Sequence, residues 1–326
     1  MKITKKTLII SIGIISILSV FLACFAFPDG DPKTESESIP TSYTNVLAAP
    51  HLPTEINFAD EKVPLEVYWV KERLEKEMII ISYQHSKTIQ TIQRMPRFFP
   101  IIDEILKEEG VPADFKYLCV AESNLENVIS PAKAVGYWQF LEATGKSFGL
   151  TINEDVDERY DLEASTRAAC KYLKGAKERL GSWALAAAAY NMGEAGVKRN
   201  IDKQQTKNYW DLSLNQETSR YLYRILAYKL IFENPQTYGV QLTNAELYQP
   251  IPTKYYEVSE PIQDLYAFAI GKNITYLELK MLNPWLRNTK LTVGYKNRKI
   301  KLPETPKITT DKLLKKVVQP ERMLGE

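Results

Sequence analysis

Glu122 is the side chain in this sequence whose neighbours best suit proton transfer. It follows a mostly apolar stretch, residues 117–121, and on a helix Leu118, Cys119 and Leu125 would share its face. Burial disfavours the charged form of a carboxyl group, so we expect the pKa of Glu122 to be raised by about 2 units. A carboxyl group that stays protonated near neutral pH can give its proton to a glycosidic oxygen.

The position of a second carboxylate would determine which cleavage mechanism such an acid takes part in. Most glycosidases pair two carboxylates, about 5–5.5 Å apart for retention and about 6.5–9.5 Å apart for inversion. Glu126 stands four residues after Glu122, but the stretch "NLENVISP" is typical of a chain that is leaving a helix. Asp155, Asp157 and Asp161 lie in a polar loop and are distant candidates. The residues alone therefore give no clear second carboxylate.

The counts of histidine, cysteine and charged residues limit the chemistry further. His51 and His85 are the only histidines, so we expect neither a Ser/His/Asp triad in the main domain nor a His-rich metal site, and no cofactor. The 42 basic and 40 acidic residues nearly cancel, whereas a nucleic-acid binder has a strongly basic domain. Cys119 and Cys170 lie on helical patterns, which favours two buried thiols and leaves a bridge between them open.

Apolar residues recur every three or four positions from residue 63 to residue 231, which predicts a helical domain. Gly110 and Gly181 mark two helix ends. Asp114 and Ser182 are placed to cap the helices "FKYLCVAES" and "WALAAAAYN". Both of these helices end in polar residues.

After Pro235 the pattern changes. The stretches "TKYYEV" and "NRKIKLP" indicate short strands on either side of two helical segments, "IQDLYAFAIG" and "TYLELKMLNP". The sequence thus predicts a mainly α protein, with a helical domain over 61–240 and a small β-α-α-β module over 250–305. The basic tail, 306–326, favours a solvated end, with attraction to anionic polymers as the alternative.

Residues 1–27 have the layout of an export signal or a membrane anchor. Basic residues precede an uncharged run of about 20 residues, which suits a signal peptide or a span of the bilayer. The stretch "FLAC", ending at Cys24, resembles a lipoprotein signal in which Cys24 would carry the lipid, and a plain apolar anchor is the alternative. The polar, proline-dotted segment over 28–60 predicts a flexible tether.

Four motifs in the helical domain are informative through their order and spacing. They are "AES" at 121–123, "GYWQF" at 136–140, "AAYNMG" at 188–193 and "ETSRYLYRI" at 217–225. Together they resemble lytic transglycosylases of the soluble-lytic-transglycosylase type, glycoside hydrolase family 23, and most of all its membrane-bound D branch. The resemblance implies a lysozyme-like fold. Trp138, inside the second motif, is expected to pack in the core.

The resemblance implies that Glu122 cleaves peptidoglycan as a single general acid and then base. It would protonate the bond between N-acetylmuramic acid (MurNAc) and N-acetylglucosamine (GlcNAc) while the 2-acetamido group of the sugar assists. The ionised Glu122 would then take a proton from the 6-hydroxyl, leaving a 1,6-anhydroMurNAc end. Two alternatives are a muramidase that uses water and a non-catalytic wall-binding or scaffold protein.

The same resemblance gives roles to five residues beside the acid. Ser123 would position the muramic sugar, and Gln139 would hydrogen-bond the substrate. Tyr190 and Asn191 would stabilise charge and orient groups, and Tyr221 would shape the cleft. Amides and hydroxyls suit this task because they bind sugar hydroxyls without adding charge.

The C-terminal module is similar to a LysM repeat, a fold that binds GlcNAc-containing glycans. The similarity lies in "LNP" at 282–284 and the closing "IKLP" at 300–303. Where LysM has a Gly-Asp-Thr-Leu-type turn, this sequence has "PIQDL" at 261–265, so glycan binding and a purely packing role both stay open. We expect a periplasm-facing enzyme of the cell envelope, tethered to a membrane or secreted, whose partners are glycan strands, the membrane and other wall enzymes.

Overall fold

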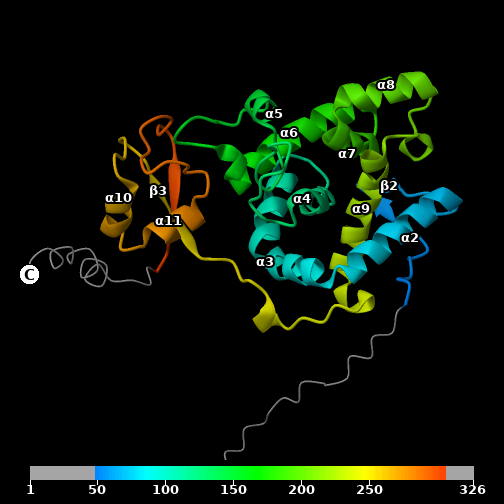
Figure 1. The fold of residues 1–326 in the computed structure, drawn as a ribbon, viewed down its shortest axis with the longest axis horizontal. Coiled ribbons are helices and arrows are strands. Elements are labelled where there is room, and N and C mark those ends of the chain that lie inside the picture. The colour runs from blue at the N-terminus through cyan, green and yellow to red at the C-terminus, as the bar shows by residue number, and fades with distance from the viewer. Residues whose placement is uncertain (1–47, 306–326) are drawn as a thin grey trace, which may run out of the picture. The chain divides into compact units, whose positions relative to one another are not determined.

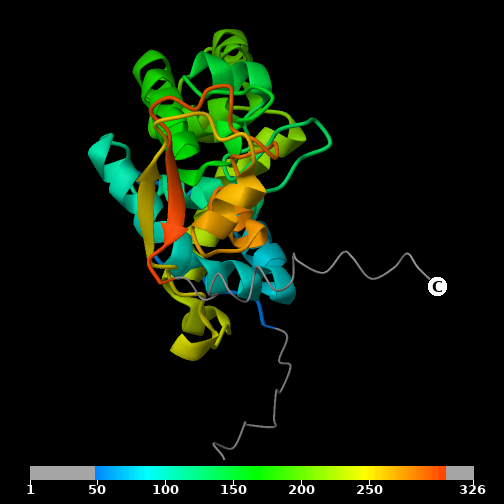
Figure 2. The ribbon, with the colours of Figure 1, turned by 90° about the vertical axis from the view of Figure 1, so that its left-hand side faces the viewer.

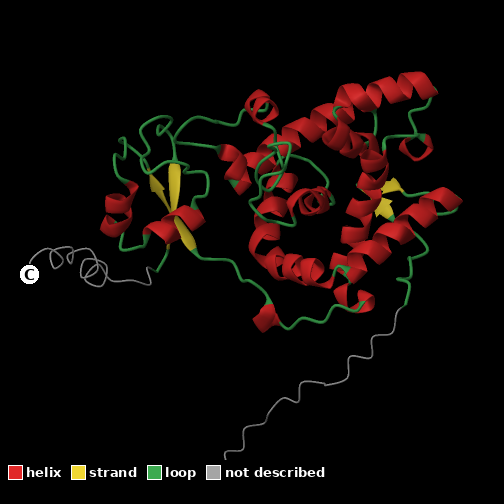
Figure 3. Cartoon of the chain, in the orientation of Figure 1, coloured by secondary structure: helices red, strands yellow, loops and turns green. Residues whose placement is uncertain are grey.

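The computed structural model describes residues 48–305; the expected leader over 1–27, Cys24 within it and the basic tail lie outside the described residues. The described chain forms a helical domain and a small C-terminal module (Figures 1 and 3). In chain order the elements are β1 (Asn57–Phe58), β2 (Glu61–Lys62), α2 (Tyr68–Tyr83), α3 (His85–Glu108), α4 (Phe115–Ser123), α5 (Glu142–Ser147), η1 (Glu158–Tyr160), α6 (Leu162–Leu180), α7 (Trp183–Met192), α8 (Glu194–Gln204), η2 (Tyr209–Asp211), α9 (Gln216–Glu233), η3 (Pro235–Tyr238), η4 (Asn244–Glu246), β3 (Thr253–Glu257), α10 (Leu265–Gly271), α11 (Tyr276–Leu282) and β4 (Lys299–Pro303).

The short helix α4 lies at the centre of the helical domain, with longer helices around it (Figure 1). Its apolar residues Leu118, Cys119 and Val120 are fully buried, as expected for a helix that is apolar on all sides. Asn124 ends α4 in the left-handed conformation, with φ of 53°, and its backbone N–H donates to the Val120 carbonyl at 2.8 Å. The polar end of α4 is therefore held inside the domain.

The β1–β2 hairpin supplies a cap that the sequence did not predict. The Glu61 carboxylate accepts hydrogen bonds from the backbone N–H groups of Trp183 (2.6 Å) and Ala184 (3.0 Å), at the start of α7. Phe58 in this hairpin is buried in the main core. The tether expected over 28–60 therefore ends before the hairpin, and its earlier part lies outside the described residues.

The two expected helix caps have different outcomes. Ser182 caps α7 as predicted, because its hydroxyl accepts the Leu185 N–H at 3.1 Å. The prediction for Asp114 was wrong, since its side chain makes no cap bond to α4. Its carboxylate instead accepts the backbone N–H of Ala59 at 2.8 Å and pairs with Lys229 at 2.6 Å. Two partners distant in sequence outcompete the local cap.

The cysteines and the helix-ending glycines are as the sequence predicted. Cys119 and Cys170 are both buried free thiols, so the bridge that had stayed open is absent from the described residues. Gly110 follows α3 and Gly181 ends α6, both with positive φ. A left-handed residue at a helix end costs glycine little, which is why these positions stop the helices.

The C-terminal module has the predicted β-α-α-β order. Strands β3 and β4 pair antiparallel in the register Thr253↔Pro303 to Glu257↔Lys299, and Figures 1 and 2 show them side by side. The module's core, which includes Leu265, Leu279 and Ile300, continues into Val135, Val156 and Tyr160 of the helical domain. Thr275 caps α11 through the Glu278 N–H at 3.0 Å. The fold is therefore mainly helical with a small LysM-like end.

None of the helices in the described chain, 48–305, has the length and apolar character needed to cross a membrane.

Candidate functional site

Glu122 lies one residue before the end of α4 and faces α9. The hydroxyl of Tyr221 donates a hydrogen bond to its carboxyl oxygen Oε1. Burial raises the pKa of Glu122 to about 7; the Tyr221 hydrogen bond and the charge of Arg224 lower it, while the charge of Glu217 raises it. Near neutral pH the carboxyl group is thus divided between its protonated and ionised forms, which suits a group that must donate and then accept a proton.

The helical face proposed for Glu122 is correct only in part. Leu118 and Cys119 are buried on α4 as expected, but Leu125 lies beyond the helix end, with φ of 60°. Leu125 is still buried, at 1% exposure, because the chain turns back into the core. Glu126 is directed away from Glu122, as the sequence suggested, and forms an ion pair with Arg94 of α3.

The end of α7 brings Tyr190 and Asn191 to the same place. The Tyr190 hydroxyl donates to the Trp138 carbonyl at 2.8 Å. Burial first, and then the charge of Glu122, raise the pKa of Tyr190 well above its usual value, so Tyr190 is a neutral donor. Asn191 accepts from the Thr218 hydroxyl at 2.7 Å and donates to Glu217 Oε1 at 3.2 Å. These bonds join α7 to α9 beside Glu122.

Gln139 lies in the segment 128–140 in a left-handed conformation, with φ of 51°. Its amide nitrogen donates to the carbonyls of Val128 (3.0 Å) and Gly136 (2.7 Å), so this half of the side chain ties the segment together. In the described chain no residue donates a hydrogen bond to the amide oxygen, so this oxygen is free to accept one.

Ser123 and Trp138 are both turned into the protein. The Ser123 hydroxyl donates to the Cys119 carbonyl at 3.2 Å, and the residue is 3% exposed, so contact with a ligand would require that bond to be exchanged. Trp138 is fully buried, with its indole N–H donating to Thr166 Oγ1 at 2.8 Å. The prediction that Trp138 packs in the core is confirmed.

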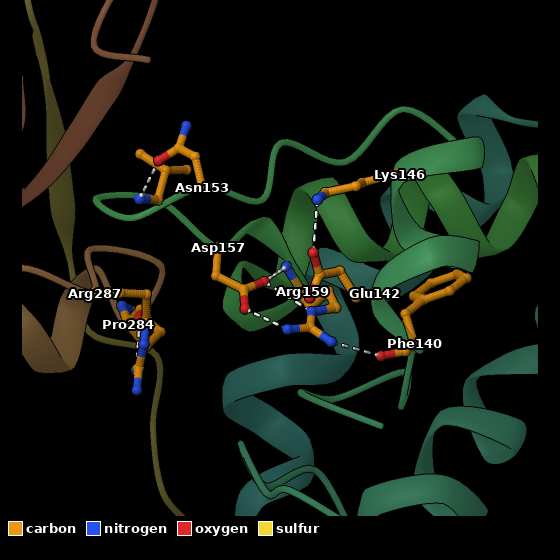
Figure 4. Close-up of polar contacts among 9 residues, drawn as sticks. Phe140, Glu142, Lys146, Asn153, Asp157, Arg159, Pro284 and Arg287 are labelled. Carbon is orange, nitrogen blue, oxygen red and sulfur yellow. Dashed lines mark hydrogen bonds and ion pairs between the residues drawn. The ribbon is translucent and has the colours of Figure 1, made fainter. Parts of the chain in front are cut away.

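The segment that carries Gln139 rests on the loop before α6. Arg159 is buried; its guanidinium donates to Asp157 at 3.0 and 2.7 Å and to the Phe140 carbonyl at 3.4 Å (Figure 4). Gly136, with φ of 85°, lies so close that an added Cβ would be 1.8 Å from the Arg159 carbonyl oxygen. A glycine is required there.

The same loop holds the C-terminal module. The buried Asp155 carboxylate accepts hydrogen bonds from Asn288, Thr292 and Val293, and the Asp157 N–H donates to the Trp285 carbonyl at 2.9 Å. Asp155 and Asp157 are therefore anchors of the fold, and Asp161 caps α6 through the Ala164 N–H at 2.9 Å. These three carboxylates have structural partners away from Glu122.

Sequence reasoning included Glu217 in the fourth motif but gave it no role at the site, and it missed Arg224. The charge of Glu217 raises the pKa of Glu122, and Glu217 accepts a hydrogen bond from Asn191. Glu217 is therefore the nearby second carboxylate that the residues alone did not identify. Both residues belong to the motif at 217–225, and they stand four before and three after Tyr221. Helical spacing from Tyr221 was the signal that could have found them. The described residues contain no cluster of three or more His, Cys, Asp or Glu side chains arranged for a metal ion.

Comparison with known proteins agrees with this arrangement. The family model described as "Transglycosylase SLT domain" matches residues 99–213, and that described as "Soluble lytic transglycosylase C-terminal LysM-like domain" matches residues 254–306. The chain therefore contains an SLT transglycosylase domain followed by a LysM-like domain, as the motifs indicated.

The chain is also similar to membrane-bound lytic murein transglycosylase D of Escherichia coli strain K12 and of strain O6:H1. Each match is 28% identical over 228 residues, which cover 68% of this chain and 49% of the relative. A shorter match, 32% identical over 114 residues, is to a protein of Alteromonas sp. (strain M-1) whose name refers to tributyltin chloride resistance; it covers 34% of this chain and 55% of that protein. The chain thus spans about half the length of the curated relatives it matches.

Proposed function

We propose that the chain is a peptidoglycan lytic transglycosylase, a lyase that cleaves the β-1,4 bond between MurNAc and GlcNAc and leaves 1,6-anhydroMurNAc ends. The observation that carries the proposal is Glu122, whose burial raises its pKa to about 7 beside the hydroxyl of Tyr221. It lies within a matched SLT domain. Wall remodelling or turnover is the process that such cleavage would serve.

Glu122 performs both proton transfers in this proposal. Its proton goes to the glycosidic oxygen that leaves with GlcNAc, as the bond from that oxygen to C1 of MurNAc breaks and the 2-acetamido group of the same MurNAc assists at C1. The ionised Glu122 then removes the proton of the MurNAc 6-hydroxyl while that oxygen bonds to C1. The second transfer restores the protonated acid, and no water is consumed.

The other side chains bind and orient the substrate. The amide oxygen of Gln139 accepts from a sugar hydroxyl, and Tyr190 and Asn191 orient groups and stabilise charge beside Glu122. Tyr221 donates to Glu122 and stabilises its ionised form. For Ser123, the proposed contact with the muramic sugar requires its hydroxyl to leave the Cys119 carbonyl.

The remaining parts of the chain bring this domain to its substrate. The leader over 1–27 exports the protein and either is removed or holds it at a membrane, with Cys24 as the lipid-bearing residue of a lipoprotein. The part of the expected tether that precedes the described residues lets the domain reach the wall, because Leu52 already packs on the helical domain. The LysM-like module binds GlcNAc-containing glycan, and other wall enzymes are partners in the same envelope.

Digestion of purified sacculi tests the proposal. The wild-type chain is expected to release products that are lighter by one water than reducing muropeptides, whereas exclusively reducing ends would overturn the lyase assignment. A muramidase is the second candidate, favoured by Glu217, which lies near Glu122 and could activate water. In that case Glu217→Gln would lose hydrolysis and no anhydro ends would form.

Glu122→Gln is the variant that tests the acid itself. Its activity is expected to fall by a factor of about 10²–10⁴, the contribution of a general acid-base group. The variant should also fold well. A carboxyl group with a raised pKa destabilises the folded protein when it is ionised. This destabilisation is absent below the unfolded pKa and reaches its full size above the folded pKa of about 7. Removing it should stabilise the protein above pH 7, by up to about 3 kcal/mol. Digestion by this variant at the wild-type rate would exclude catalysis by Glu122.

A further inference from the structure

Two side chains of α9 contact the polar end of α4, and Arg224 lies between them along the helix. Tyr221, Arg224 and Tyr228 are three and four residues apart, so they share one face of the helix. Tyr221 donates to Glu122, and the Tyr228 hydroxyl donates to Asn124 Oδ1 at 3.2 Å. Arg224 lies between these two anchors along α9, close enough for its charge to lower the pKa of Glu122.

A buried carboxylate on α2 holds Arg224 in this position. Glu77 is 1% exposed, and its Oε2 lies 4.0 Å from Arg224 Nε, while its Oε1 lies 2.5 Å from Arg220 Nε. Removing the cation from a buried ion pair is strongly destabilising. Glu77 therefore holds the Arg224 side chain in place and partly neutralises its charge.

We infer that Arg224, held by Glu77, is a positioning residue that stabilises the ionised form of Glu122 between its two proton transfers. The inference rests on the proposed function, in which one carboxyl group must first be an acid and then a base. A bare buried carboxylate would be formed only at high cost in the first step. A cation in direct contact would keep Glu122 ionised and remove the acid. Arg224 does not contact Glu122 directly, and its charge is partly neutralised by Glu77. It therefore lowers the cost of ionising Glu122 without keeping Glu122 permanently ionised.

Several other charged or titratable groups surround Glu122. They are Tyr221 and Glu217 on α9, Tyr190 on α7 and Cys119 on α4, with Arg94 of α3 paired to Glu126 beyond the helix end. Arg224 is the cation among the groups that shift the pKa of Glu122. Arg94 is the matched control, because this cation is paired to Glu126 beyond the end of α4 and is not among the groups that shift the pKa of Glu122.

The test is the pH dependence of kcat/KM for sacculus digestion by the full chain. Its alkaline limb reports loss of the proton from Glu122 in the free enzyme. Arg224→Met removes a charge that favours the carboxylate, so the limb should move to higher pH by about 1 unit, and Arg224→Lys should return it toward the wild-type position. Glu77→Gln leaves Arg224 less neutralised and should move the limb to lower pH. Arg94→Met should leave the limb in place.

A second measurement separates this inference from the proposed function. In protein labelled with carbon-13 at the glutamate carboxyl carbons, the Glu122 signal is the one that Glu122→Gln lacks, and its titration needs no substrate. If sacculi are not digested, the proposed function fails while the titration still tests Arg224. An unchanged Glu122 titration in Arg224→Met with a wild-type melting temperature would overturn the inference. If Arg224→Met fails to fold, the shift to lower pH in Glu77→Gln decides.

Discussion

Replacing Asp155 with alanine should release the C-terminal module while leaving the helical domain folded. Asp155 is fully buried, and its Oδ2 accepts from the Thr292 N–H (2.7 Å), the Thr292 hydroxyl (2.9 Å) and the Val293 N–H (2.9 Å). Its Oδ1 accepts from Asn288 at 2.8 Å. One side chain thus satisfies four donors of the loop before β4, and alanine satisfies none.

The size of the effect follows from these contacts. A hydrogen bond to a charged group contributes about 1.5–3 kcal/mol, and bonds that share one carboxylate do not add in full, so we expect a loss of about 3–5 kcal/mol. A folded unit the size of the module, residues 253–303, has a stability of only about 3–8 kcal/mol. The loss is therefore comparable to the stability of the module, which the ion pairs Arg298–Glu158 and Lys301–Glu163 also hold to the helical domain.

Hydrogen–deuterium exchange on the full chain measures this directly. In Asp155→Ala, amides in α11 and β4 should lose protection, while those in α9 should keep it. The exposed neighbour Glu154 provides the control, since Glu154→Ala should leave both regions protected. Wild-type protection of the module in Asp155→Ala would refute the reasoning.

Acid should mimic the substitution. Burial alone would raise the pKa of Asp155, but the hydrogen bonds from Val293, Thr292 and Asn288 outweigh it and lower the pKa below its usual value. A depressed pKa means that this stabilisation is present above the unfolded value and is lost as pH falls through the folded one. Protection of the module should therefore decline below about pH 4 in the wild type, and this decline should be smaller in Asp155→Ala, where only carboxylates such as Glu163 remain to be protonated.

Three further substitutions test the site and its support. Tyr221→Phe removes a hydrogen bond that favours the ionised Glu122, so the alkaline limb of kcat/KM should move upward by about 1 pH unit. Gly136→Ala forces a Cβ against the Arg159 carbonyl, and should lower the free energy of unfolding by at least about 2 kcal/mol in urea titration and raise KM. Ser182→Ala removes one cap of α7 and should cost about 1 kcal/mol in the same titration, with KM unchanged.

The sequence predicted the parts of the fold that depend on local patterns. The helical spacing, the glycine stops and the strands at either end of the module all appear where the residues favoured them, because each depends on neighbours within a turn or a hairpin. The Asp114 cap failed for the opposite reason: its partners, Ala59 and Lys229, are 55 and 115 residues away. A pattern within one helix cannot show that distant residues bind Asp114 in place of the helix N-terminus.

The site shows the same division between local and distant information. The apolar run before Glu122 predicted a raised pKa, and burial is its largest cause. What limits that rise is Tyr221, 99 residues further along the chain, together with Arg224. The sequence could identify a residue fit to be an acid, but the groups that lower its pKa again come from α9, where that helix packs on α4. In the mechanism proposed above, the charge on α9 and the burial of Glu122 would together set the pH at which one residue performs both steps.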